Sequence, residues 1–252
     1  MPKAKPKKKA SAKKKARKPL VTVPHDRPIH ISFLLDETGS MQACASNAIS
    51  GFNEYIGNMQ REKVPVQMTL CTFNSERKNI RYADEPIAKI EPLSGKTYKP
   101  DAMTPLLDSV DVIIKRTEET EEKAKKEGKD LAILFVILTD GLENASKEFH
   151  QKQIRDLIEK KQKGGWTFVY LGANQDAWDI GRRMGIVGGA TMSYVPTAVG
   201  QIIGNTLSQA TVAYSHTVRT GGTIGSPNFW SNAGISSDDD KKKKDKNRLP
   251  TT

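Results

Sequence analysis

The chain has 252 residues, of which 37% are hydrophobic and 27% are charged, and this size fits one large domain or two small ones. No apolar run approaches the roughly 20 residues of a membrane-spanning helix, and the basic N-terminus lacks the apolar stretch of a secretory signal, so we expect a cytoplasmic protein that is not attached to a membrane. The formal net charge of +11 lies in the ends, because residues 1–18 carry +10, residues 237–252 carry +2 and the residues between them are close to neutral.

Both ends of the chain are low in complexity. Residues 1–19 are mainly Lys, Ala and Pro, and the other end closes on a run of Asp and Lys. Such segments cannot bury enough apolar surface to fold. We therefore predict a disordered basic tail over 1–19, a folded domain over 20–222 and a flexible tail over 223–252. Residues 1–18 would bind nucleic acid without sequence preference, or they form a solubilising extension; the sequence leaves both open.

Apolar runs and amphipathic segments alternate along the domain. The predicted strands are 29–36, 64–73, a short antiparallel pair within 76–93 on either side of Pro86, 131–141, 166–173 and 190–195. The predicted helices are 43–61, 104–128 with Thr104 as N-cap and Pro105 as its first residue, 147–163, 174–185 and 195–219. This alternation predicts an α/β fold, with a doubly wound, mostly parallel, Rossmann-like sheet flanked by helices. Ligands of such sheets bind outside the carboxyl ends of the strands.

Oxygen-bearing side chains gather where two predicted central strands end. Asp36 closes the first strand, and Thr38 and Ser40 follow it at every second position. Asp140 ends the strand 131–141, and Thr104 begins a helix. Carboxylate and hydroxyl oxygens suit a hard cation such as Mg²⁺. Taken alone, the first three residues could instead form a turn that caps the following helix.

Three motifs resemble the metal-ion-dependent adhesion site of von Willebrand factor type A (vWA) domains: Asp36-Glu37-Thr38-Gly39-Ser40-Met41, Thr104-Pro105-Leu106 and Thr139-Asp140-Gly141. The resemblance covers roughly residues 27–215, and the stretches TDGLEN and YLGANQDA look like those of bacterial and phage-type intracellular members. The chain departs from the family pattern in two places. Thr38 replaces the commoner Ser, and Asp101-Ala102-Met103 replaces a Gly pair that many members carry before the Thr.

The resemblance implies a metal site and a function. Ser40 and Thr104 would coordinate the metal directly, Asp36 often acts through water, Asp140 acts directly or through water, and Thr38 helps to hold the loop and the metal. The cation would be Mg²⁺, or Mn²⁺ or Ca²⁺. The last coordination position would be left for an Asp or Glu carboxylate of a partner protein. The resemblance thus predicts a vWA-like domain over 20–222 that is an interaction module and not an enzyme.

The sequence also fits two functions other than a metal-dependent interaction module. The first is that of a nucleic-acid-associated protein anchored by residues 1–18. The second is a Mg²⁺-dependent phosphohydrolase with Asp36 as nucleophile, as in haloacid dehalogenase phosphatases. Those enzymes need a second Asp two residues further on, and this chain has Thr38 there, so the general acid is missing and the hydrolase is disfavoured.

Overall fold

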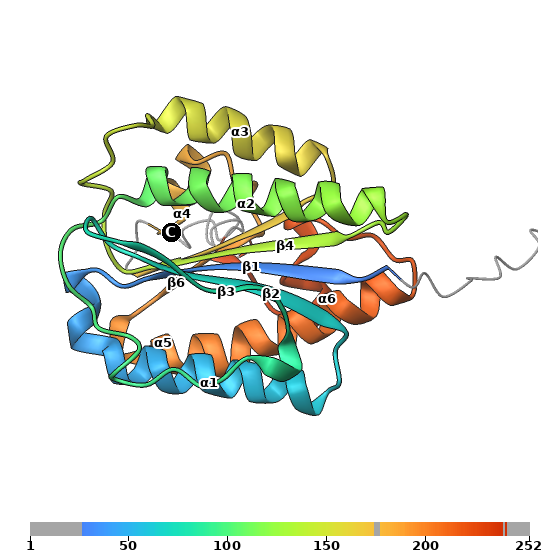
Figure 1. Ribbon diagram of the computed structural model, residues 1–252, viewed down its shortest axis with the longest axis horizontal. Helices are drawn as coiled ribbons and strands as arrows, with labels where there is room; N and C mark the ends of the chain where they lie inside the picture. Colours follow the sequence, from blue (N-terminus) through green and yellow to red (C-terminus); the bar gives the residue numbers. More distant parts are fainter. Residues whose placement is uncertain (1–26, 174–176, 239, 241–252) are drawn as a thin grey trace, which may run out of the picture.

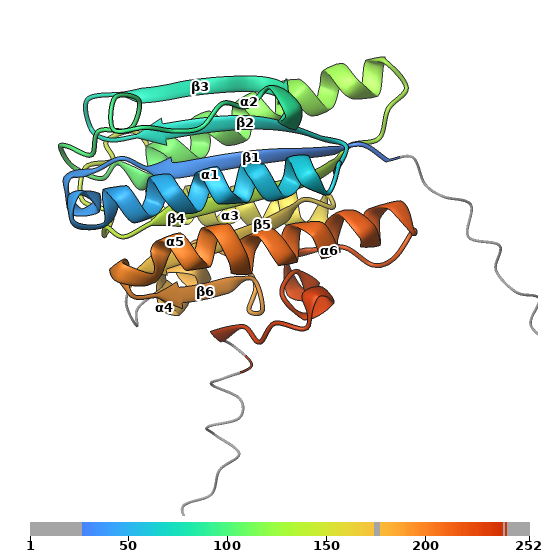
Figure 2. The same ribbon diagram turned by 90° about the horizontal axis from the view of Figure 1, so that it is seen from below.

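The computed structural model describes residues 27–173, 177–238 and 240. Its centre is a six-stranded sheet in the order β3-β2-β1-β4-β5-β6 (Figures 1 and 2). The strands are β1 (Ile29–Asp36), β2 (Val66–Phe73), β3 (Lys78–Pro86), β4 (Ala132–Thr139), β5 (Thr167–Ala173) and β6 (Thr191–Tyr194). All neighbouring pairs are parallel except β2 and β3. The predicted doubly wound, mostly parallel α/β sheet is confirmed.

Helices cover both faces of the sheet, so the molecule has three layers (Figure 1). On one face lie α1 (Ala45–Arg61), α5 (Val199–Gln201) and α6 (Ser208–Arg219), and on the other lie α2 (Leu106–Lys126), α3 (Gln151–Lys163) and α4 (Ala177–Arg183). A 3-10 helix, Gly39–Cys44, leads from β1 into α1, and a π-helix, Ile202–Leu207, joins α5 to α6. None of the helices in the described part of the chain is both long and apolar enough to cross a membrane.

The two central strands are continuous apolar runs because both of their faces are covered. All eight residues of β1 and all eight of β4 are buried. Phe33 points toward α1, where its ring meets those of Phe52 and Tyr55 at centroid distances of 5.6 and 5.9 Å. The opposite face of β1 carries Ser32, whose hydroxyl lies 2.6 Å from that of Thr117 in α2. This packing fixes where β1 ends and therefore where Asp36 lies.

Three local expectations differ from the structure. The predicted antiparallel pair within 76–93 is the single strand β3, which pairs with β2 and ends at Pro86, where the missing N–H stops the ladder. Helix α2 begins at Leu106, and Thr104 is not its cap. The helix expected from residue 147 begins at Gln151, because Asp108 holds the backbone N–H groups of residues 147–149 in a loop.

The domain continues beyond residue 222, where we expected a flexible tail to begin. Phe229 and Trp230 are fully buried in the core, and the ring of Phe229 lies 6.0 Å from that of Tyr214. The backbone N–H of Phe168 in β5 donates to the hydroxyl of Ser226 at 2.7 Å. Burial of two large aromatic side chains holds residues 223–238 on the domain. The predicted tail 1–19, residues 20–26 of the predicted domain, and residues 241–252 lie outside the described residues.

Candidate metal centre

The candidate site lies at the carboxyl edge of the sheet, where β1 and β4 end side by side. Leu35 pairs with Leu138 in the parallel register, so Asp36 and Thr139 are neighbours across the two strands. The hydroxyl of Thr139 donates to Asp36 Oδ2 at 2.5 Å, and the backbone N–H of Thr38 donates to Asp36 Oδ1 at 2.7 Å. Asp36 is fully buried, so these two bonds fix both oxygens of its carboxylate.

Ser40 links the loop after β1 to the loop after β4. Its hydroxyl donates to Asp140 Oδ1 at 2.5 Å and lies 3.1 Å from the hydroxyl of Thr38. Ser40 is exposed and Asp140 is partly buried, whereas Thr38 is 1% exposed. Ser40 and Asp140 are therefore the more exposed members of this group, whereas Asp36 and Thr38 are buried.

Gly141 places Thr104 in the same cluster. A Cβ atom added at Gly141 would lie 2.7 Å from Thr104 Oγ1 and 3.3 Å from Ser40 Oγ. Thr104 is held from the loop after β4, because its N–H donates to Asn144 Oδ1 at 2.8 Å and its carbonyl accepts from the N–H of Asn144 at 3.1 Å. The structure thus brings all five predicted residues to one edge: Asp36, Thr38, Ser40, Thr104 and Asp140. Their role as metal ligands stays a prediction.

The two carboxylates lie in an environment that disfavours their charge. Burial raises the pKa of Asp36 to about 6, against the opposing effect of its hydrogen bonds from Thr139 and Thr38, and Asp140 adds a smaller repulsion. Burial also raises the pKa of Asp140, which the bond from Ser40 partly offsets. No Lys, Arg or His of the described residues forms an ion pair with either carboxylate. A bound cation would therefore find uncompensated negative charge here.

The donor set fits a hard divalent cation. Its oxygens come from two carboxylates and three hydroxyls, which suit Mg²⁺, Mn²⁺ or Ca²⁺. Over residues 27–173, 177–238 and 240, no three His, Cys, Asp or Glu side chains are grouped as at a metal centre. A zinc-type site of nitrogen and sulfur ligands is therefore absent from this part of the chain.

Glu37 supports the site and was not predicted. It is 1% exposed, and its carboxylate accepts from Arg81 at 3.2 and 3.3 Å and from the N–H of Lys99 at 2.6 Å. These bonds attach the loop before Thr104 to the loop after β1. Glu37 and Arg81 are far apart in sequence and meet only in the folded sheet, so their ion pair could not be predicted. The sequence showed only that an acidic residue lies within the motif that contains Asp36, Thr38 and Ser40. Asp101, in the loop before Thr104, is exposed, and its carboxylate accepts from the N–H of its neighbour Ala102.

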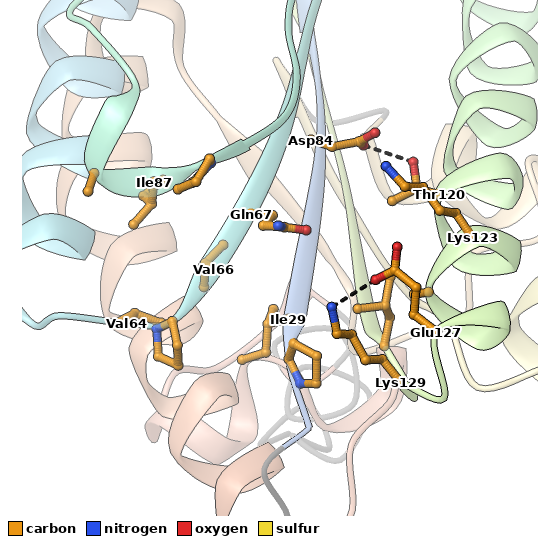
Figure 3. A pocket seen from close by; sticks show the side chains of 16 residues that line it. Ile29, Val64, Val66, Gln67, Asp84, Ile87, Thr120, Lys123, Glu127 and Lys129 are labelled. Atoms are coloured by element: carbon orange, nitrogen blue, oxygen red, sulfur yellow. Dashed lines mark hydrogen bonds and ion pairs between the residues drawn. The ribbon is translucent and has the colours of Figure 1, made fainter.

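A separate cavity of about 540 Å³ lies at the opposite end of the sheet (Figure 3). Its apolar wall includes Ile29 and Val66 at the first residues of β1 and β2. Asp84 forms part of its polar wall and accepts from the hydroxyl of Thr120 at 2.8 Å. Because Asp36 is the last residue of β1 and Asp140 follows the last residue of β4, this cavity is separated from both carboxylates by the length of the strands.

Comparison with solved structures concerns the fold. The chain is similar to the pilus adhesin SpaC of Lactobacillus rhamnosus GG, with 11% identity over 72% of this chain and a TM-score of 0.52. It is also similar to the TRAP protein of Plasmodium vivax, with 15% identity over 71% of this chain and 73% of that one (TM-score 0.44), and to the SpRpn10 VWA domain, with 7% identity over 68% and 92% (TM-score 0.44). No protein-family model and no curated protein sequence matches the chain.

The chain spans only 30% of SpaC and 46% of proximal thread matrix protein 1 from the mussel byssus, another similar structure. What those whole proteins do is therefore not carried over to this one. The sheet order and the similarity to SpaC together give the fold class, which is a doubly wound, mostly parallel α/β domain.

Proposed function

We propose that the carboxyl edge of the sheet binds Mg²⁺ and that the bound metal captures a carboxylate of a partner protein. Ser40, Thr104 and Asp140 would hold the cation directly, with Asp36 and Thr38 behind them. Mn²⁺ or Ca²⁺ would suit the same oxygens. The bound cation supplies a positive centre for an acidic side chain of the partner. The bacterial or phage-type origin and the cytoplasmic location predicted from the sequence belong to this proposal.

The observation that carries the proposal is the convergence of five oxygen-bearing side chains, two of which are carboxylates that form no ion pair with a basic side chain of the described residues. Ser40 Oγ lies 2.5 Å from Asp140 Oδ1, and the position of a Cβ at Gly141 is close to both Ser40 Oγ and Thr104 Oγ1. A turn that only capped a helix would account for neither the approach of Thr104 nor the burial of Asp36. Burying an uncompensated carboxylate is costly, and a divalent cation would offset that cost.

The same geometry favours capture over hydrolysis. A nucleophilic Asp needs a carboxylate oxygen free to attack, whereas Asp36 is fully buried and both of its oxygens accept hydrogen bonds. Ser40 and Asp140 are the most exposed residues of the cluster. Mg²⁺ usually binds one or two protein carboxylates and keeps further positions for water or a ligand. A partner carboxylate can occupy such a position.

The metal site is tested by thermal unfolding of the purified protein with and without Mg²⁺. At about 100 times its dissociation constant, the metal stabilises the domain by about 2.7 kcal/mol, which raises Tm by about 5–10 °C for a domain of this size. We expect Asp36→Ala, Ser40→Ala and Thr104→Val to lose this shift. Asp101→Asn is the matched control, since Asp101 is an exposed acid of the same edge, and it should keep the full shift.

An equal Mg²⁺ shift in the wild type and in all three variants would refute the site. The capture step is tested separately by binding of acidic peptides in Mg²⁺ and in EDTA. Phosphatase or nuclease turnover that needs Mg²⁺ and disappears in Asp36→Ala would instead assign a hydrolase.

A further inference from the structure

Large apolar side chains are exposed at the carboxyl edge of the sheet. The exposed large apolar residues of the described chain are Ile80, Met103, Leu142, Val187 and Val195. Met103 precedes Thr104, and Leu142 follows Asp140 by two positions, so these two adjoin candidate ligands in sequence. Leu142 is 65% exposed and Met103 is 55% exposed; Val195, which follows β6 at the same edge, is 59% exposed. Two exposed apolar side chains thus lie next to candidate ligands along the chain.

The loop that carries Met103 is fixed by hydrogen bonds. The backbone N–H of Met103 donates to the hydroxyl of Ser75 at 3.1 Å, and its carbonyl accepts from the N–H of Ser75 at 2.8 Å. The next residue, Thr104, is bonded twice to Asn144. The Met103 side chain is therefore exposed on a loop whose backbone is held in one position by hydrogen bonds.

Leu142 is likewise held between two anchored residues. Gly141 forms hydrogen bonds through both its N–H and its carbonyl to the hydroxyl of Thr139. On the other side, the carboxylate of Glu143 accepts from the N–H groups of Leu107, Ala145 and Ser146 and from the hydroxyl of Ser146, at 2.7–3.0 Å. An apolar side chain that is preorganised and exposed contributes to binding with little ordering cost.

A cavity of about 400 Å³ adjoins Leu142. Its apolar wall is formed by Leu106, Leu107, Leu142, Ile180 and Met184. Arg183, Glu143 and Gln151 form the polar part. The cavity lies between the first turns of α2 and α3 and helix α4, directly beside the loop that follows Asp140. A cavity of this size has room for a large apolar side chain of a bound segment.

We propose that Met103 and Leu142 select the partner of the metal site. They would favour a protein segment in which an Asp or Glu is accompanied by a large apolar side chain, with the apolar side chain entering the cavity beside Leu142. This rests on the function proposed above and names the chemistry of the partner more closely. We propose a segment of another protein as the ligand of this surface. The bound cation would need an acidic group, and the apolar cavity beside Leu142 would need an apolar side chain. Neither a free anion nor a nucleic acid supplies both.

The probe is a library of random linear peptides displayed on phage, selected on the full chain in Mg²⁺ and eluted with EDTA. We expect the enriched peptides to contain an acidic residue with Leu, Ile, Met or Phe nearby. Replacing either residue of an enriched peptide with Ala should weaken binding. Enrichment of acidic peptides without an apolar preference would overturn this inference and leave the metal function in place.

Variants of the protein then test the two side chains. Met103→Ser and Leu142→Ser should each weaken binding of a selected peptide by about tenfold or more, as truncation of a central apolar contact does, with an unchanged Mg²⁺ shift in Tm. Val187→Ser is the matched control, because Val187 is exposed but lines a cavity with Trp166, the residue before β5, at the other end of the sheet. It should bind as the wild type does.

The outcomes separate the two proposals. If Met103→Ser and Leu142→Ser bind the peptide as the wild type does while Ser40→Ala loses binding, the role of Met103 and Leu142 is refuted and the metal function is retained. Undiminished binding by Ser40→Ala, or no EDTA-eluted peptide at all, would refute the metal function and this inference with it. Sedimentation of the protein as a Mg²⁺-dependent dimer that Leu142→Ser dissociates would show that a second copy is the occupant, against this proposal.

Discussion

Gly141→Ala tests the candidate site without removing any of its oxygens. The added Cβ would lie 2.7 Å from Thr104 Oγ1 and 3.3 Å from Ser40 Oγ, whereas ordinary van der Waals contact begins at 3.4 Å. The hydroxyl of Thr104 must therefore move by about 0.7 Å to relieve the overlap. Mg²⁺ requires near-ideal octahedral geometry at about 2.0–2.1 Å from each oxygen, so a shift of this size takes Thr104 out of coordination range.

The magnitude follows from the change in affinity. Disturbing the support of a metal ligand typically lowers affinity by about 10–100-fold. At a Mg²⁺ concentration 100 times the wild-type dissociation constant, stabilisation by the metal would fall from about 2.7 kcal/mol to about 0.4–1.4 kcal/mol. The assay is a Mg²⁺ titration of Tm, with isothermal calorimetry on the same samples as a direct measure of affinity.

Gly57→Ala is the matched control for this substitution. Gly57 lies in α1, and no atom lies within 4 Å of its added Cβ. Replacing a helical Gly by Ala should raise stability by up to about 1 kcal/mol and leave Mg²⁺ affinity unchanged. Wild-type Mg²⁺ affinity in Gly141→Ala would refute the placement of Thr104 in the metal site, and equal loss in both variants would show that the measurement reports stability alone.

The remaining predictions concern the rest of the molecule. Burial lowers the pKa of His30 to about 4; the charge of Asp84 opposes this shift and that of Arg116 adds to it. The unfolded chain therefore binds more protons than the folded chain between pH 6.5 and 4, and the free energy of unfolding should fall by up to about 3 kcal/mol as the pH is lowered across that window. Urea unfolding measures this dependence on pH, and His30→Leu should remove it. Trp230→Ala should destabilise the domain by about 3–5 kcal/mol in the same assay, whereas a loss below about 0.5 kcal/mol would return residues 223–238 to the tail. Deleting residues 1–18 should abolish salt-sensitive binding to duplex DNA and leave the Mg²⁺ shift intact; binding that survives the deletion would place the nucleic-acid contact on the domain.

The sheet was predictable because its central strands carry their own signal. The runs that became β1 and β4 are apolar over their whole length, which is typical of strands covered on both faces. Once these strands are parallel, Asp36 and Asp140 must follow their ends at the same edge. The position of the candidate site thus depends on local patterns and one topological rule, and the structure agrees with both.

Other features depend on tertiary contacts that no local pattern reports. We expected Thr104 to cap α2, but Glu143 does so instead. Its carboxylate accepts from the N–H of Leu107 in the first turn of the helix, and it lies 36 residues further along the chain. Phe229 and Trp230 lie in a stretch rich in Gly, Ser and Asn, without the periodicity of a helix or strand, so their burial against Tyr214 left no signal. Thr139 belongs to a motif that the sequence showed, but its hydrogen bond to Asp36 depends on the pairing of β1 with β4 and could not be predicted from that motif.

Under the proposed function, the burial pattern of the site would make a partner acid a suitable ligand. Asp36 is buried and both of its oxygens accept hydrogen bonds, so its charge would act on a bound cation mainly through the field rather than by contact. Thr38, Ser40 and Thr104 are neutral, which leaves Asp140 as the accessible carboxylate. A divalent cation held in direct contact by one carboxylate and neutral hydroxyls keeps a net positive charge toward solvent. An acidic side chain of a partner protein would then complete the coordination shell of the cation. Because Asp140 would be the charged ligand, removing its side chain should weaken metal binding more than removing that of Thr38.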